Sequence, residues 1–268
     1  MTELEELIEL LNKKEKLVAM LAPSFPIMFE YPGIITKLKK LGFSYVMEVS
    51  LGAMKTNQEL VELMTKNPES RFITSPCPTV VRMVRKQMPE YAKYFTHGVD
   101  SPMVATAKIA RENFPGFRPI FIGPCIVNKM EAKEDVPDLN ILVITYAEIS
   151  QVFEKFNIGG EVNLNDKFDL SGPGDTRIYP VDGGLSHSSG VLDKLGEGAI
   201  KIVSSWKNCL EAIKDFDTNT KVRLLDILFC EGGCIGGPGI KSSLTVEQKK
   251  QKILDYRNKD NSSKISNI

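Results

Sequence analysis

The sequence lacks the marks of several large functional classes. Its 34 basic and 34 acidic residues cancel, so we expect neither a nucleic-acid surface nor an electrostatic membrane anchor. No apolar run reaches the roughly 18 residues that a membrane span requires, and the acidic start, Met1-Thr-Glu-Leu-Glu-Glu, is unlike a secretion signal. We therefore expect a cytoplasmic protein with no membrane or nucleic-acid partner, which acts on a small molecule or on another protein.

Histidine is scarce, and the glycine-rich stretches do not end as a phosphate-binding loop ends. His97 and His187 are the only histidines and lie away from the cysteines in the sequence, so we expect them in turns or on the surface. The glycines of residues 232–239 are not followed by Gly-Lys-Ser or Gly-Lys-Thr, which argues against nucleotide binding. Hydrophobic residues make up 42% of the chain, which is normal for a soluble globular protein with a sizeable core.

Five cysteines are present, and their odd number in a chain without an export signal favours reduced thiols over a disulfide framework. Cys230 and Cys234 lie in Cys-Glu-Gly-Gly-Cys-Ile-Gly-Gly-Pro-Gly, directly after the apolar run of residues 222–229. That run is typical of a buried strand, and the glycines after it let the backbone turn tightly or approach a ligand. A thiolate pair in this setting suits an iron–sulfur cluster, although an ordinary buried-thiol role stays open for these residues taken alone.

Helical and extended patterns alternate along the chain, which indicates an α/β fold with mostly parallel sheets. After the last strand we expect a helix and then a polar, frayed tail. We expect strands at residues 17–21, 43–49, 71–74, 118–122, 140–144, 199–203 and 222–229, and helices at 3–16, 34–41, 57–66, 80–88, 103–113, 146–156, 185–195, 206–214 and 245–256.

Four residues with polar or metal-binding side chains each follow an expected strand directly: Ser24, Cys77, Cys125 and Cys230. Ligands of parallel α/β sheets gather beyond the carboxyl ends of the strands, so these residues are expected to share one site. Prolines flank both lone cysteines and fix the backbone there. Cys209 lies inside an expected helix, and we interpret it as a packing residue outside the site.

Several motifs, taken together, resemble those of the cluster-bearing domain of the iron-only hydrogenases. Their order and spacing agree with that family along roughly residues 16–240. The matching segments are Ala22-Pro-Ser24, Thr74-Ser-Pro-Cys-Pro78 (Thr-Ser-Cys-Cys-Pro in the family), Asp100-Ser-Pro-Met103, Gly123-Pro-Cys125 with Lys129 (Met-Pro-Cys-x-x-Lys-Lys), Tyr179-Pro-Val-Asp-Gly-Gly184, and Cys230-Glu-Gly-Gly-Cys234 (Cys-Pro-Gly-Gly-Cys).

The resemblance implies two lobes of mostly parallel sheet flanked by helices, with a metal cluster in the cleft between them. It implies that Cys77, Cys125, Cys230 and Cys234 ligate a cubane [4Fe-4S] cluster. Cys234 would also bridge to a two-iron subcluster, with CO, cyanide and dithiolate ligands, where protons and H2 interconvert. The cluster domain would span residues 1–240, and residues 241–268 would form the C-terminal helix and tail.

The resemblance also implies roles around the two-iron subcluster, and here the sequence departs from the family. Ser24 would donate a hydrogen bond to a cyanide, and Tyr179 would form an aromatic wall. Pro76 replaces the cysteine that delivers protons in catalytic members. Asn128 replaces the lysine that pairs with a cyanide, and Lys129 stands one residue off. Gly123 and Met103 replace a methionine and a glutamine. Each change weakens the two-iron site and leaves the cubane ligands intact.

Three hypotheses follow. The first is an iron-only-hydrogenase-like protein, active in H2 or redox sensing or in slow H2 oxidation and proton reduction; Pro76 leaves open whether it is an enzyme. No Cys-x2-Cys-x2-Cys run is present for a further cluster, so a ferredoxin-like or signalling protein would be its redox partner. The second is an iron–sulfur electron-transfer or cluster-assembly protein without the two-iron subcluster. The third is a structural zinc protein with four cysteine ligands.

Overall fold

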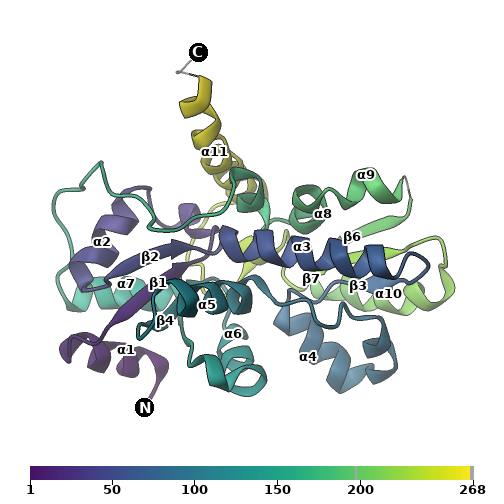
Figure 1. Ribbon diagram of the computed structural model, residues 1–268, viewed down its shortest axis with the longest axis horizontal. Coiled ribbons are helices and arrows are strands. Elements are labelled where there is room, and N and C mark those ends of the chain that lie inside the picture. Colours follow the sequence, from purple (N-terminus) through teal and green to yellow (C-terminus); the bar gives the residue numbers. More distant parts are fainter. Residues whose placement is uncertain (197, 266–268) are drawn as a thin grey trace.

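A computed structural model of the chain describes residues 1–196 and 198–265, with side chains described as far as residue 259. It has two parallel sheets, one in each of two lobes that lie side by side (Figure 1). This confirms the α/β fold with parallel sheets and flanking helices. The first sheet has the order β2 (Tyr45–Glu48), β1 (Leu17–Leu21), β4 (Arg118–Gly123) and β5 (Leu142–Thr145), and the second has the order β3 (Phe72–Ile73), β7 (Leu224–Leu228) and β6 (Ile200–Ser204).

The first lobe is built around the two central strands of its sheet. All five residues of β1 are fully buried, as expected for an unbroken apolar run in a parallel sheet that is covered on both faces. Thr145 begins α7 with a capping box that it shares with Glu148, so the helix starts directly where β5 ends. The helices packed on this sheet are α1 (Glu3–Asn12), α2 (Gly33–Leu41), α5 (Pro102–Asn113), the short α6 (Asn128–Met130) and α7 (Tyr146–Lys155).

The second lobe has its own core, and the long helix α3 (Ser50–Lys66) links it to the first. α3 begins just after β2 of the first sheet and packs along α5. Farther on, its Leu60 and Met64 pack with Leu224 of the second sheet. The remaining helices of this lobe are α4 (Pro78–Gln87), α8 (Gly184–Ser189), α9 (Val191–Leu195) and α10 (Trp206–Thr218).

The helices expected at residues 185–195 and 57–66 differ from the observed ones in continuity and in starting point, respectively. The helix expected at residues 185–195 is divided into α8 and α9 because Gly190 adopts a left-handed conformation (φ 73°) that ends the first of them. α3 begins at Ser50, seven residues before the expected start at Asn57. Its added first turns contain Gly52, where a side chain would clash with Pro102 and Thr106 of α5, so glycine permits the close packing of the two helices.

The C-terminal helix α11 (Val246–Ile265) runs past Tyr256, where we expected it to end, and projects from the body of the molecule in Figure 1. The rest of the expected frayed tail, residues 266–268, lies outside the described residues. Near the middle of α11 the Tyr256 hydroxyl donates a hydrogen bond to Glu48 at 2.7 Å. No helix in the described part of the chain combines the length and the apolar character needed to cross a membrane. The domain boundary expected at residue 240 stays a prediction.

Candidate metal centre

The carboxyl ends of the two sheets face a common pocket between the lobes. Ser24 follows β1 and Cys125 follows β4 of the first sheet, whereas Cys77 follows β3 and Cys230 follows β7 of the second. The empty space of this pocket, part of which is open to solvent, is about 800 Å³. All seven residues that the sequence nominated line it: Ser24, Cys77, Cys125, Asn128, Tyr179, Cys230 and Cys234. The structure thus brings these strand ends to one pocket, and the role of the pocket as a binding site stays a prediction.

Prolines and close backbone contacts position the cysteines. Cys77 has an extended backbone (φ −96°, ψ 104°) and caps α4, whose first residue is Pro78. The loop that carries Cys234 packs tightly on the loop that carries Cys125: a Cβ added to Gly237 would lie 2.7 Å from the carbonyl oxygen of Pro124. Only glycine allows this approach, which brings cysteines from distant parts of the chain to the same pocket.

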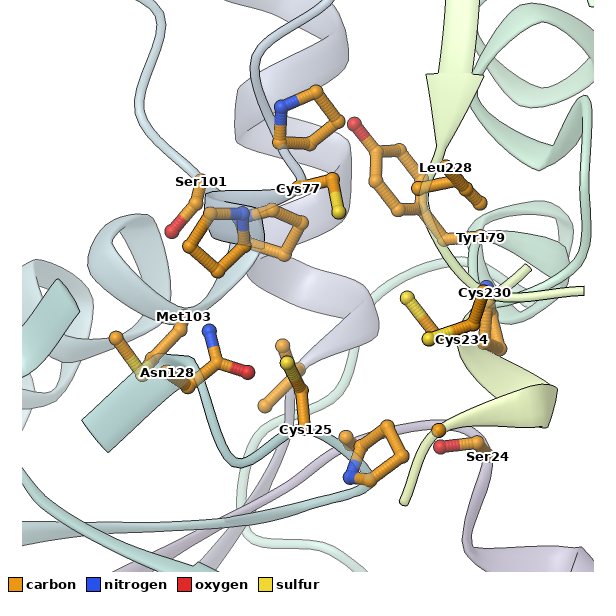
Figure 2. Close-up of a pocket in the computed structure, with 18 of the residues that line it drawn as sticks. Ser24, Cys77, Ser101, Met103, Cys125, Asn128, Tyr179, Leu228, Cys230 and Cys234 are labelled. Carbon is orange, nitrogen blue, oxygen red and sulfur yellow. The ribbon is translucent and has the colours of Figure 1, made fainter. Parts of the chain in front are cut away.

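The thiols face a shared space but are not gathered around one point. Figure 2 shows the sulfur atoms of Cys77 and Cys125 on two sides of the pocket, with Cys230 and Cys234 on a third. No group of three or more Cys, His, Asp or Glu side chains in the described ranges could hold a single metal ion. A tetrahedral zinc site with bonds of about 2.3 Å would require sulfurs about 3.8 Å apart. A cubane cluster binds each thiolate through a different iron, so a wider spacing suits it.

Burial controls the protonation of these thiols. It raises the pKa of Cys77, Cys125 and Cys234, and it raises the pKa of Cys230 to about 12. In the metal-free pocket the four thiols are therefore protonated at neutral pH and are poor nucleophiles. A metal that binds them displaces the protons and supplies the positive charge that stabilises the thiolates. The donor set is thus suited to metal binding and unsuited to thiol-based catalysis.

The residues that the sequence placed outside the site are outside it. Cys209 is fully buried in α10, and its thiol donates to the carbonyl oxygen of Leu228 at 3.4 Å. His97 and His187 are exposed. None of these side chains lines the cysteine pocket.

Asn128, and not Lys129, faces the pocket. The Asn128 side chain is 7% exposed and donates from Nδ2 to Oε2 of Glu131 at 2.7 Å. The Lys129 ammonium turns away and pairs with Glu148 at 2.6 Å and with Glu3 at 3.3 Å. The neighbouring lysine therefore cannot supply the positive charge that the family's lysine brings to this position, and the pocket wall here is neutral.

Ser24 is fully buried, and its hydroxyl lies 2.9 Å from the hydroxyl of Tyr146. Tyr146 in turn donates its proton to the carbonyl oxygen of Ala22 at 2.6 Å. A phenol has only one proton, so Ser24 is the donor in the bond between the two hydroxyls. In this arrangement Ser24 donates its hydroxyl proton to Tyr146, so towards a ligand in the pocket the Ser24 oxygen can only accept a hydrogen bond.

The Tyr179 ring lines the pocket, as do Cys77 and Leu228, and all three are labelled in Figure 2. Burial raises the pKa of its hydroxyl well above the usual value, so this group stays a neutral donor. Its oxygen is buried and has no hydrogen-bond partner among the described residues. An unpaired buried hydroxyl costs about 1–3 kcal/mol, so a polar partner at this wall would stabilise the pocket. Pro76 and Met103 also line the pocket.

Sequence reasoning missed Glu131, which does not line the pocket but accepts a hydrogen bond from the pocket residue Asn128. Its carboxyl group is buried, and burial raises its pKa to about 7, against the opposing effect of hydrogen bonds from Ser101 and Asn128. It begins a short π-helical turn (Glu131–Asp135), which often marks a functional site. In the sequence the residue belongs to the charged run Glu131-Ala-Lys-Glu-Asp, which is typical of an exposed surface.

Solved structures of [FeFe]-hydrogenases resemble this chain across nearly its whole length. A variant of HydA1 from Chlamydomonas reinhardtii matches with a TM-score of 0.69 and 17% identity, covering 96% of this chain and 88% of that chain. The apo form of HydA1 from the same organism, in another variant, gives the same values. The structure of HydA(deltaEFG), from a study of stepwise H-cluster assembly, matches with a TM-score of 0.68 and 16% identity and the same coverage. At these identities the likeness shows a common fold.

A sequence profile gives the family. The profile described as "Iron only hydrogenase large subunit, C-terminal domain" matches residues 15–238, which is more than half of the 268-residue chain. The match includes all four cysteines of the pocket. This chain is therefore a member of the iron-only hydrogenase large subunit, C-terminal domain family.

Proposed function

We propose that Cys77, Cys125, Cys230 and Cys234 bind a [4Fe-4S] cluster. The observation that supports this is the convergence of four cysteines, from three separate loops, on one pocket at the carboxyl ends of both sheets. When bound, the cluster would supply one-electron redox chemistry. The chain's own contribution is to hold four thiols in rigid loops and to limit their contact with water, which favours metal ligation over thiol oxidation.

We further propose that Cys234 is the bridging ligand of a two-iron subcluster and that the protein serves in H2 or redox sensing, or in slow H2 oxidation and proton reduction. The pocket extends beyond the cysteines to Ser24, Asn128 and Tyr179, which gives the space and polar groups for a larger cofactor. Slow turnover is expected because Pro76, on the pocket wall, has no exchangeable proton. H2 or protons would then be the substrate, and protons would reach the site slowly.

A separate redox partner is part of the proposal. The chain has one cysteine besides the four of the pocket, Cys209, and it is buried inside a helix. A single thiol cannot bind a second cluster, so this chain has no internal relay for electrons. We expect a ferredoxin-like or signalling protein to exchange electrons with the cluster, in the cytoplasm and without a membrane or nucleic-acid partner.

A second candidate function is electron transfer or cluster assembly with the cubane alone. Two observations favour it. The Ser24 proton is donated to Tyr146, and the Asn128 amide donates to Glu131, so both groups expected around a two-iron subcluster have partners inside the protein. Neither interaction would disturb a cluster held by the four cysteines.

Metal analysis separates the candidates. The protein would be purified without oxygen after co-expression with maturation enzymes, and iron, acid-labile sulfide and zinc would be measured per chain. About four irons with equal sulfide would support the cubane alone, and about six irons with CO and cyanide infrared bands would support the two-iron subcluster. Zinc without iron would refute the proposal. Cys125→Ser should lower the iron content, whereas Cys209→Ser, the matched control outside the pocket, should not.

A further inference from the structure

The loop between Cys230 and Cys234 is held at its middle residue, Gly232, from outside the cysteine pocket. The Gly232 amide donates to Oγ of Ser204 at 3.2 Å, and the Gly232 carbonyl oxygen accepts from the amide of Asp182 at 3.1 Å. Neither Ser204 nor Asp182 lines the pocket. Two of the four proposed cluster ligands therefore depend for their position on residues that would not touch the cluster.

The Asp182 carboxylate joins these contacts. Its Oδ2 atom accepts from the Ser204 hydroxyl at 3.2 Å. A hydroxyl group has one proton and two lone pairs, so Ser204 donates to Asp182 while it accepts from the Gly232 amide. Asp182 thus holds Gly232 twice, directly through its backbone amide and indirectly through Ser204.

The C-terminal helix α11 supports the same carboxylate. Lys250 of α11 pairs with Oδ1 of Asp182 at 2.8 Å, and both side chains are half-buried. Val246 of the same helix packs against the loop, since a Cβ added to Gly232 would lie 2.6 Å from its Cγ1 atom. The helix therefore contacts the cysteine loop directly and is also connected to it through Asp182.

Strand β6 also holds the cysteine loop, although it gives no residue to the pocket. Ser204 is the last residue of β6, and the next residue, Ser205, donates from its amide to the Cys230 carbonyl oxygen at 3.3 Å. Ser205 has a φ of 75°, which residues with side chains rarely adopt. Such a conformation persists only where the surrounding structure imposes it. This strain, next to a hydrogen bond to a cluster cysteine, indicates that the end of β6 is constrained by the cysteine loop.

We propose that Asp182 is a positioning residue for the cluster, which fixes the loop of Cys230 and Cys234 through Ser204 while Lys250 offsets its negative charge. The inference rests on the proposed function, because it concerns the retention and the reduction potential of a cluster bound by these cysteines. Asp182 acts in two ways, through its hydrogen bonds and through its charge. Substitutions separate the two effects.

The charge of Asp182 predicts shifts of opposite sign in the reduction potential. Nearby negative charge disfavours the uptake of an electron by a cluster. Asp182→Asn keeps an oxygen that accepts from Ser204 but removes the charge, so the potential should rise. Lys250→Met leaves the carboxylate without its positive partner, so the potential should fall. The matched control is Asp215→Asn, which removes the same charge from an exposed pair with Lys201 of β6 and should leave the potential unchanged.

The hydrogen bond predicts how firmly the cluster is retained. Asp182→Ala removes the acceptor of the Ser204 proton, and the loop of Cys230 and Cys234 gains freedom. Iron should then be lost to the chelator EDTA about tenfold faster, which is the effect expected for one hydrogen bond to a charged group. Asp182→Asn should restore most of the retention, because its amide oxygen still accepts from Ser204.

Both effects are measured on the cluster-loaded protein, by redox titration with electron paramagnetic resonance and by iron release over time. Shifts of the same sign in Asp182→Asn and Lys250→Met, or an equal shift in Asp215→Asn, would overturn the inference. So would Asp182→Ala protein that retains its iron as long as the unaltered protein; if this variant does not fold, the potentials of the other variants still decide. A protein without iron would refute the proposed function, whereas a bound cluster with unchanged potentials would refute this inference alone.

Discussion

The buried ion pair between Glu48 and Arg177 gives a specific prediction about the free energy of unfolding and its dependence on pH. Both side chains are almost completely buried, and Arg177 donates from Nε to the Glu48 carboxylate at 3.0 Å. Tyr256 of α11 donates to the same carboxylate, and its ring lies 4.5 Å from the Arg177 guanidinium. Arg177 is two residues from Tyr179, so the pair ties the pocket wall to the C-terminal helix and to the end of β2.

Replacing Arg177 by methionine keeps most of the side-chain volume and leaves the Glu48 carboxylate without its positive partner. Breaking a buried pair in this way costs about 3–5 kcal/mol of the free energy of unfolding. The cost should depend on pH. Burial raises the pKa of Glu48 above its ordinary value of 4.5, and the charge of Arg177 opposes that rise, so the variant has the higher folded-state pKa.

The sign of the pH effect follows from proton binding. Between the unfolded and folded pKa values of Glu48 the folded protein binds the additional proton, so stability is lost as the pH rises through that range. The loss caused by Arg177→Met should therefore be larger at pH 7.5 than at pH 5, by at most about 1.4 kcal/mol for each pH unit between them.

Urea unfolding of the two proteins at pH 5 and pH 7.5 measures this difference. Adding Glu48→Gln to Arg177→Met should restore part of the stability, because the unpaired charge is removed. Tyr256→Phe should cost only about 1 kcal/mol, the value of a single hydrogen bond. A loss below 1 kcal/mol, or an equal loss at both pH values, would show that the ion pair does not have the assigned role.

Three shorter predictions concern the cysteine pocket. Gly237→Ala should lower stability by about 1–3 kcal/mol and reduce bound iron, because the added Cβ would lie 2.7 Å from the Pro124 carbonyl oxygen; unchanged melting and iron content would contradict this. Pro76→Cys should raise any H2 evolution by the protein that carries its full cofactor. An H2-evolving activity that is already high and does not change in this variant would contradict the inference that Pro76 slows proton delivery. In metal-free protein at pH 8, Cys230 should react with iodoacetamide about 10³-fold more slowly than a free thiol, given its pKa of about 12; a comparable rate would contradict the assigned burial.

The sequence predicted the strands well because their signal is local. The apolar run Leu17–Leu21 becomes β1 with the same bounds, since an unbroken apolar run is typical of a strand in a parallel sheet that is covered on both faces. The helix expected at residues 185–195 is interrupted at Gly190, whose left-handed conformation is not indicated by the helical spacing of the apolar residues around it. The first turns of α3 were missed because glycine at position 52 weakens the helical signal and is explained only by the contact with α5.

Sequence motifs predicted the residues that line the candidate site, but not the side chains with which those residues interact. Motifs mark the residues that would touch a cofactor, and all of these line the pocket. Motifs do not mark the partners of those residues. Tyr146 lies 122 positions from Ser24 in the chain, and nothing local indicates that the two hydroxyls meet. Glu131 is buried and lines a pocket together with residues of α4 and with Ser101. The charged run around it in the sequence does not indicate this burial.

The pairing of β3 with β7 fixes when the pocket can exist during synthesis. β3 leads to Cys77 and β7 leads to Cys230, and the two strands are neighbours in space although they are far apart in the chain. When all four strands of the first sheet have been synthesised, Cys77 and Cys125 are present, but β7 and the loop that carries Cys230 and Cys234 are still to come. Non-local parallel pairing of this kind forms late and slowly. A cofactor that needs all four thiols must accordingly be delivered to a finished polypeptide, and supply of the cofactor becomes a step separate from translation.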